Sequence, residues 1–381
     1  MNQEQMNAAM ESLTQWLAHP AELGKAPAKI ECAGEFELHD LHYYIFRYKK
    51  SLMGKWLLGV CGGYEGDGLE HCGHVFSEME DYDPATAREK AIALVEVMRS
   101  YWMEQARRAE EQKENPGTFV NYVLLKEARW DKEALLRDLK ETWGIEDEPD
   151  DSEDEDSEDE DSKNEDSEDE GGEDGETDEV FLISYQGAMI AVSFMPAPIP
   201  DGEAEEAAAK NFMWRNGAEQ VKDHVAHLLI AVMGKEISPI ECGTFLVKTV
   251  VSACRQDGVL GIYTGEVVYA PDYYQHFSGM LEEDLFPIYN LVWIGIYNGK
   301  KGLCAYTGGM RYFGYDEMEV LDSQADVQTL HEFLSDIANY VISEDVVLHD
   351  GETIGFSEDQ KLPITKSGGV AVEGDSLKIE F

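Results

Sequence analysis

Basic residues are scarce in this 381-residue chain: 30 Lys and Arg stand against 78 Asp and Glu, which gives a net charge of −48 at pH 7. A chain of this sign is repelled by phosphate backbones and by anionic lipid, so we expect neither a nucleic-acid partner nor a membrane partner. No stretch approaches the ~20 apolar residues of a membrane-spanning helix, and the N-terminal segment has no basic leader. Basic proteins are the partners that this composition favours.

Cysteine is also sparse, and no two cysteines form a CxxC pair. Each lies in an apolar or strand-like context, which predicts buried free thiols in a reducing compartment rather than disulfides. We therefore expect a cytoplasmic protein. The cysteines are Cys32, Cys61, Cys72, Cys242, Cys254 and Cys304.

The common catalytic motifs are missing as well. The sequence has no GxSxG elbow, no Walker A loop, no GxGxxG after a strand, no HExxH and no EF-hand loop. The pairs Glu31–Cys32 and Glu241–Cys242 have no neighbouring base, so nucleophilic cysteine chemistry has no visible support. These absences favour a non-enzymatic protein without a cofactor. Acid pairs are too plentiful in this chain to indicate acid–base catalysis at any one of them.

Two groups of residues are candidates for metal binding. The first is His71, Cys72 and His74, but on a strand residue 71 points away from both of the others. Zinc needs four ligands converging at about 2.0 to 2.3 Å, so this spacing is unfavourable. The second group is His224 and His227, which a helical turn would align and a strand would separate. For both groups ordinary structural residues are the favoured interpretation, and a metal site is the alternative.

The first part of the chain predicts a small α+β domain over residues 1–112. Apolar residues at three-to-four spacing indicate an amphipathic helix over residues 3–18. Asp83 and Pro84 form a good N-cap and N1 pair for a second helix that runs to about residue 110. Between the helices, short runs rich in aromatic and β-branched residues predict an antiparallel meander. The predicted strands are 30–38, 41–48, 55–61 and 72–79.

A second, larger α+β domain is expected over residues 118–381. It opens with a strand at residues 119–125 and a helix that Asp131 caps and Gly144 ends. The buried face of this helix consists of Leu135, Leu136, Leu139 and Trp143. One strand and one helix cannot form a core, so their packing partner should be the hairpin predicted at residues 180–195.

An acidic run separates these elements. Residues 146–179 hold 23 Asp or Glu against the single Lys163, and residues 151–170 are four pentads of the type DSEDE. Such a segment cannot bury enough apolar surface to fold, so the sequence predicts a disordered loop that interrupts the domain. The serines of the pentads are candidates for phosphorylation. The candidate partner-binding residues of the run are Asp151, Glu153, Asp154, Glu155, Glu158, Asp159 and Glu160.

Helices and hairpin-linked strands alternate after the run, which favours an α+β fold with a mixed, mostly antiparallel sheet over a doubly wound parallel sheet. The predicted helices are 203–216, 238–255, 272–281 and 326–342. The predicted strands are 226–233, 259–267, 289–297, 302–306 and 317–321, followed by ETIGF, LPITK and SLKIEF. The triplet YTG occurs twice, at residues 263–265 and 306–308. These triplets are either strand ends, the commoner use of Thr-Gly, or the lining of a small-molecule pocket.

Several segments resemble a bacterial family, domain of unknown function 4261. They are HVAHLLIAV, GVLGIYTGEVVYAPDYY, LVWIGIY, AYTGGMRYFGYDEMEV and LHDGETIGF, together with YVLLKEARWDKEALLRDLKETWGI. The likeness spans roughly residues 120–381, with the acidic run as an insertion. The resemblance implies no reaction, cofactor or catalytic residue, and it is compatible with toxin-neutralising or interaction modules.

The sequence therefore favours a non-enzymatic protein whose acidic surface binds a basic protein partner, in the manner of an antitoxin or immunity protein. Opposite charges raise association rates and select partners. Two alternatives stay open: a hydrolase with a site in the larger domain, and an acidic chaperone that shields basic proteins.

Overall fold

The computed structural model describes residues 2–19, 22–66, 74–77, 80–148, 180–234, 237–357 and 360–381. The chain divides into two units, Met1–Ala106 and Arg107–Phe381. Both units combine helices with mostly antiparallel sheets, so the predicted α+β class is confirmed. Most of the acidic run, residues 149–179, lies outside the described residues, and so does the disordered loop predicted there.

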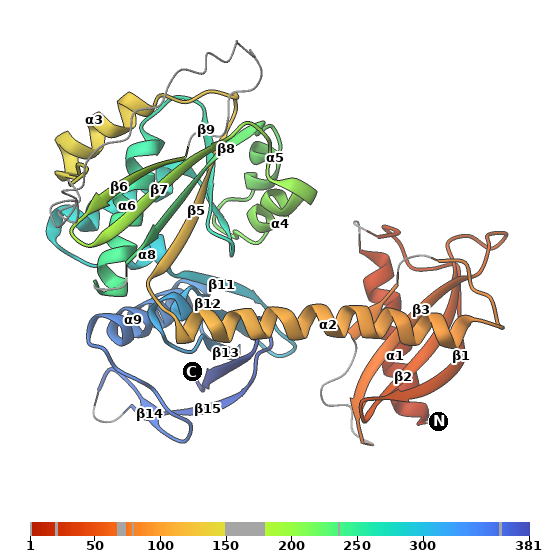
Figure 1. The fold of residues 1–381 in the computed structure, drawn as a ribbon. Coiled ribbons are helices and arrows are strands. Elements are labelled where there is room, and N and C mark those ends of the chain that lie inside the picture. The colour runs from red at the N-terminus through yellow and green to blue at the C-terminus, as the bar shows by residue number, and fades with distance from the viewer. Residues whose placement is uncertain are drawn as a thin grey trace, which may run out of the picture. The chain divides into compact units, whose positions relative to one another are not determined.

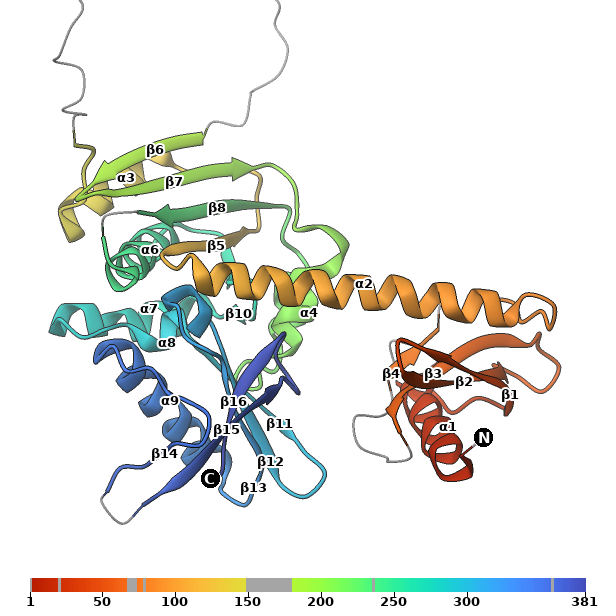
Figure 2. The ribbon, with the colours of Figure 1, turned by 60° about the horizontal axis from the view of Figure 1, so that its bottom comes forward.

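Unit 1 is built on a four-stranded antiparallel sheet with a helix on each face (Figure 2). Successive residues of a strand point to opposite faces, and β2 is apolar at both sets of positions. Tyr44 and Phe46 pack against helix α1 (Gln3–Ala18), and Tyr43 and Ile45 pack against the start of helix α2. The strands, in sheet order, are β1 (Lys29–Leu38), β2 (Leu41–Lys49), β3 (Leu57–Glu65) and β4 (His74–Phe76).

Helix α2 (Ala87–Glu114) is longer than predicted. The segment RRAEEQKE has no apolar periodicity, but its residues are good helix formers and pair along the helix. Arg107 pairs with Glu111, and Lys113 Nζ lies 3.6 Å from a carboxylate oxygen of Glu110. Loss of periodicity therefore marks the end of the buried face and not the end of the helix.

The first sheet of unit 2 contains elements from both sides of the acidic run (Figure 1). β5, which precedes the run, lies in the middle of the sheet, and the hairpin of β6 and β7, which follows it, forms one edge. Every pair in the sheet is antiparallel. In sheet order the strands are β10 (Val268–Tyr269), β9 (Val259–Tyr263), β5 (Thr118–Leu125), β8 (Ala226–Met233), β7 (Ala188–Met195) and β6 (Val180–Tyr185).

Helices α3 (Lys132–Trp143) and α6 (Pro239–Cys254) cover one face of this sheet. The Asp131 side chain accepts a hydrogen bond from Ala134 N at 2.9 Å, and Gly144 ends α3 with a φ of 67°. These are the caps that the sequence predicts for this helix. Leu135 and Leu139 of α3 are fully buried in the core that this face shares with α6.

The second sheet of unit 2 packs against helix α9 (Val327–Ser343). In sheet order its strands are β11 (Trp293–Asn298), β12 (Leu303–Gly308), β13 (Met318–Ser323), β16 (Asp375–Ile379), β15 (Leu362–Gly368) and β14 (Thr353–Ile354). β13 and β16 pair in parallel, and the other pairs are antiparallel. The remaining helical segments of unit 2 are η2 (Pro200–Gly202), α4 (Glu203–Ala209), α5 (Gly217–Val221), α7 (Pro271–Phe277), η3 (Ser278–Glu283), α8 (Ile288–Leu291) and η4 (Met310–Phe313).

Several predicted elements of unit 2 are shorter in the structure. The helix predicted at 203–216 breaks after Ala209, because the Asn211 side chain donates to Val268 O at 3.0 Å and accepts from Met213 N at 3.0 Å. Such local bonds compete with a continuing helix. The strand predicted at 259–267 ends at Tyr263, and the strand predicted at 289–297 begins at Trp293, after the helical turn α8.

Candidate functional site

The two YTG segments come together where the two sheets of unit 2 meet. Thr264 follows β9 and Gly308 ends β12, and both line one cavity of about 20 Å³. Gly308 allows this close approach, since a Cβ there would lie 3.2 Å from Glu266 Cγ. A cavity of this size holds about one water molecule. Asn290 and Trp293 also line it, and Asn290 Oδ1 is buried without a hydrogen-bond partner among the described residues.

Glu317 fixes the turn that follows β12. Its buried carboxylate accepts a hydrogen bond from Thr307 Oγ1 at 2.7 Å and another from Gly309 N at 2.9 Å. Burial raises the pKa of Glu317 above its ordinary range. The turn carries Arg311, whose guanidinium pairs with Glu266. Burial opposes the charge on Arg311, but the carboxylates of Glu266 and Glu317 raise its pKa overall.

A second buried carboxylate, Glu319, fixes the turn between β15 and β16. It accepts hydrogen bonds from Ala371 N at 2.7 Å and from Ser376 Oγ at 2.5 Å, and it pairs with Lys378 at 3.0 Å. Burial opposes ionisation of Glu319, but these partners lower its pKa below the ordinary value. The cavity beside the first of these turns is too small for a substrate. We therefore interpret the two buried glutamates as anchors of the turns and not as an acid–base pair.

The second candidate metal group consists of histidines that bind backbone. His224 Nε2 accepts from Ile199 N at 2.9 Å, and its Nδ1 lies 2.6 Å from Val221 O, so both ring nitrogens are engaged. His227, on β8, places Nδ1 2.8 Å from Ala197 O, and burial lowers its pKa. These contacts hold the segment that leads into α4.

The first candidate metal group lies almost entirely outside the described residues. His71 and Cys72 are not described, and of His74 only the backbone, in β4, is described. Within the described part of the chain, no three His, Cys, Asp or Glu side chains are grouped as a metal site.

The other face of the first sheet of unit 2 is only partly covered. Helices α4 and α5 pack on one end of it, over Leu124 and Val268. Beyond them lies a set of apolar side chains on four adjacent strands, which we call the open sheet face. Its members are Val120, Val180, Leu182, Met189, Ala191, Leu229 and Met233.

The strand register places these side chains on one surface. Leu182 lies opposite Ala191, which lies opposite Ala231, and Ala231 lies opposite Val120. The exposed fraction is 54% for Leu182 and 43% for Met189.

The open sheet face carries no charged side chain, although 28% of the residues of the chain are charged. Antiparallel sheets with one solvated face normally alternate apolar and polar residues. β6 departs from this rule, because Phe181 and Ile183 fill the core while Val180 and Leu182 are exposed on the other side. The register also places Ser184 and Ser193 on this face, and its exposed apolar side chains are Val180, Leu182, Met189 and Met233. Exposed apolar side chains gathered on one face are typical of a protein contact site.

The described residues on both sides of 149–179 meet at β6, the strand that borders the open sheet face (Figure 2): Asp147 and Glu148 lie beside its end, and Val180 begins it. At the start of the acidic run, Asp147 Oδ1 accepts from Ser184 N at 2.8 Å, and Glu148 N donates to Ser184 O at 2.8 Å. A Glu148 carboxylate oxygen accepts from Gln186 N at 2.9 Å. The chain returns at Val180, four residues before Ser184 on the same strand, a separation of roughly 13 Å. The predicted partner-binding carboxylates themselves, from Asp151 to Glu160, lie outside the described residues.

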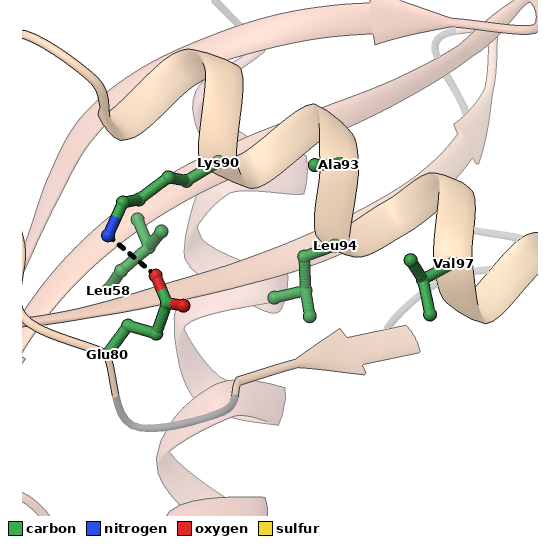
Figure 3. A pocket seen from close by; sticks show the side chains of 6 residues that line it. All are labelled: Leu58, Glu80, Lys90, Ala93, Leu94 and Val97. Atoms are coloured by element: carbon green, nitrogen blue, oxygen red, sulfur yellow. Dashed lines mark hydrogen bonds and ion pairs between the residues drawn. The ribbon is translucent and has the colours of Figure 1, made fainter.

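Unit 1 has a smaller apolar hollow beside α2 (Figure 3). Leu94 and Val97 of α2 and Leu58 of β3 form its walls, and an ion pair of 2.7 Å between Lys90 and Glu80 closes one end. Its volume of about 200 Å³ is below the roughly 300 to 1,000 Å³ of ligand sites. The hollow suits a protruding side chain better than a small molecule.

Comparison with known proteins finds one family. The model of "Domain of unknown function (DUF4261)" matches residues 306–380, which confirms the predicted resemblance over that segment. The matched segment contains Arg311, Glu317, Glu319 and the second YTG. The open sheet face and the acidic run precede it. No curated protein and no solved structure matches the chain.

None of the described helices combines the length and the apolar composition needed to cross a bilayer.

Proposed function

We propose that this protein is a non-enzymatic interaction module, which binds a basic protein partner on the open sheet face and attracts it with the acidic run. The observation that carries the proposal is that the described residues on both sides of the run meet at β6, next to an apolar surface without charge. A basic protein with an apolar contact region fits both features.

The two parts have different physical roles. Burial of apolar side chains such as Leu182 and Met189 supplies affinity, at about 25 cal/mol per Å² of apolar surface removed from water. The net charge of −22 over residues 146–179 raises the rate at which a basic partner arrives. Salt should therefore slow association strongly and accelerate dissociation only slightly.

The cellular setting is part of the proposal. The described cysteines are free thiols, and Cys61, Cys242 and Cys254 are buried, which supports a reducing compartment. We place the protein in the cytoplasm, where neutralisation of a basic toxin is one role of the proposed kind.

Paired substitutions test the proposal. Leu182→Thr with Met189→Thr removes apolar contact surface and keeps residues that favour strands. The matched control is Val347→Thr, which changes an equally exposed apolar residue elsewhere in unit 2. A third variant replaces residues 149–179 with a short Gly-Ser linker. Proteins captured by the parent and by each variant are compared by quantitative mass spectrometry, and association rates are then measured on the purified partner.

We expect one basic partner that is captured normally by the control, lost from the double variant, and bound more slowly by the linker variant. Equal capture by the parent and the double variant would contradict the proposal. An acidic chaperone would behave differently, since it would bind many basic proteins through the run whatever the state of the open sheet face.

A further inference from the structure

A groove lies on the covered side of the first sheet of unit 2, away from the open sheet face. It has a volume of about 650 Å³, within the usual range of ligand sites. Ile240, Thr244 and Lys248 form one wall, because residues four apart share a face of α6. The other walls come from η3, the segment after it and the end of α9, and their lining residues are Met280, Leu281, Asp284, Leu285, Phe286, Asn339 and Ser343.

Lys248 is the unusual member of this lining. Its side chain is partly buried. No described residue forms a hydrogen bond or an ion pair with its ammonium. Its Nζ lies 5.8 Å from the ring centre of Trp143 and 5.7 Å from that of Phe245, both aromatic rings at the range of cation–π contacts. Burial lowers the pKa of Lys248, and Asp284 opposes that change.

An ammonium that is partly desolvated and lacks a carboxylate partner is unexpected in so acidic a chain. Lys113, which is also partly buried, pairs with Asp316 at 2.7 Å. Removing a charge from water without a partner is unfavourable, and a bound anion would supply the missing partner.

We propose that this groove binds a monocarboxylate with an apolar body, of the acyl or aryl type. The carboxylate contacts Lys248, with the Thr244 hydroxyl one helical turn away, and the apolar body lies along Ile240, Met280 and Leu281. A ligand with several negative charges fits less well, because Asp284 faces the same groove. This inference does not depend on the proposed function, since it uses a different surface.

Octanoate is a suitable probe, and 1-octanol is its uncharged counterpart. Binding of each to the full chain is measured by calorimetry and by NMR of octanoate labelled with ¹³C at the carboxyl carbon. We expect one octanoate per chain, bound about tenfold or more tightly than octanol, which is the factor expected of one charge-assisted contact.

Three variants locate the site. Lys248→Met should reduce octanoate affinity to that of octanol, and Lys248→Arg should retain the preference. Asp284→Asn should strengthen octanoate binding, and Asn tolerates the left-handed conformation of this position, where φ is 55°. The matched control is Lys222→Met, which removes an exposed lysine on another element, the residue that follows α5, and should change nothing.

Two results would overturn the proposal. Equal affinity for octanoate and octanol in the parent would show that no cation takes part. Loss of octanoate binding in the Lys222→Met variant as well as in Lys248→Met would show that only the overall charge matters. Circular dichroism of each variant establishes that it is folded before its affinity is compared.

Discussion

Replacement of one leucine of α3 by alanine should destabilise all of unit 2, although the acidic run separates α3 from β6 in the sequence. Leu139 is fully buried in a core that includes Phe181 and Ile183, which follow the run. Leu139→Ala should therefore cost about 3 kcal/mol, from within the usual range of roughly 2 to 5 kcal/mol. At about 2 to 4 °C per kcal/mol for a domain of this size, the unfolding midpoint of unit 2 should fall by about 6 to 12 °C.

Two further positions on α3 calibrate this value. Leu136 is only partly buried, so Leu136→Ala is the matched control and should cost about 1 kcal/mol. Trp143 is also only partly buried, so Trp143→Ala should cost less than the roughly 3 to 5 kcal/mol of a fully buried aromatic ring. Trp143 Nε1 donates to Ser252 Oγ at 3.1 Å, and Trp143→Phe should isolate that bond at about 1 kcal/mol.

Urea denaturation gives the free energies, and hydrogen exchange shows where they act. If α3 and the hairpin share one core, Leu139→Ala should accelerate exchange of the buried amides of β6 and β7 as well as those of α3. The reasoning is refuted if the variant unfolds at the same urea concentration as the parent. It is also refuted if only α3 amides exchange faster, because the helix would then be a separate element.

Three other outcomes are expected. Glu319→Gln should destabilise unit 2 by about 3 kcal/mol, because the largely buried ammonium of Lys378 loses its only carboxylate partner among the described residues and keeps only neutral acceptors, whereas the exposed control Glu344→Gln should have no measurable effect in the same denaturation assay. Glu317 has a folded-state pKa above its ordinary value of 4.5, so the parent loses stability as the pH rises above 4.5. Glu317→Gln should therefore gain stability relative to the parent as the pH rises above 4.5, in melts at each pH. Replacement of residues 149–179 by about eight Gly and Ser residues should change stability by only about 1 kcal/mol, because closure entropy grows as the logarithm of loop length; a linker variant that does not fold would contradict this.

Elements with strong local signals were predictable from the sequence. Helix α3 has an N-cap at Asp131, a glycine at its end and one apolar face, and the structure has it where these signals place it. The break after Ala209 was not predictable in the same way, because it depends on a bond from Asn211 to Val268, 57 residues later. The contact between the two YTG segments is equally non-local, since it requires the two sheets to meet.

The open sheet face could not be located from the sequence for a related reason. In VFLISY of β6, both sets of alternating positions are largely apolar, so the pattern predicts a strand buried on both faces. Whether a second layer covers such a strand depends on where helices far along the chain pack. In unit 2, α4 and α5 cover the end of the sheet that contains Leu124, and Leu182 and Met189 stay exposed. A strand that is apolar on both sides thus signals that one of its faces could be exposed, but only the fold shows which side is open.

The first carboxylates of the acidic run also bear on which surface of β6 the proposed partner would meet. An edge strand offers both a face and a row of free backbone groups, and the free groups invite pairing with another strand. Asp147 and Glu148 occupy this edge, since they bind the backbone of Ser184 and Gln186. With that end of the edge closed, addition of a long strand along β6 is disfavoured, while the side chains of Val180 and Leu182 stay accessible. The contact that we propose is therefore one of side chains on the open sheet face. The double variant Asp147→Ala, Glu148→Ala removes the two side-chain acceptors from this edge. It should expose β6 to edge pairing, which would appear as self-association in sedimentation velocity.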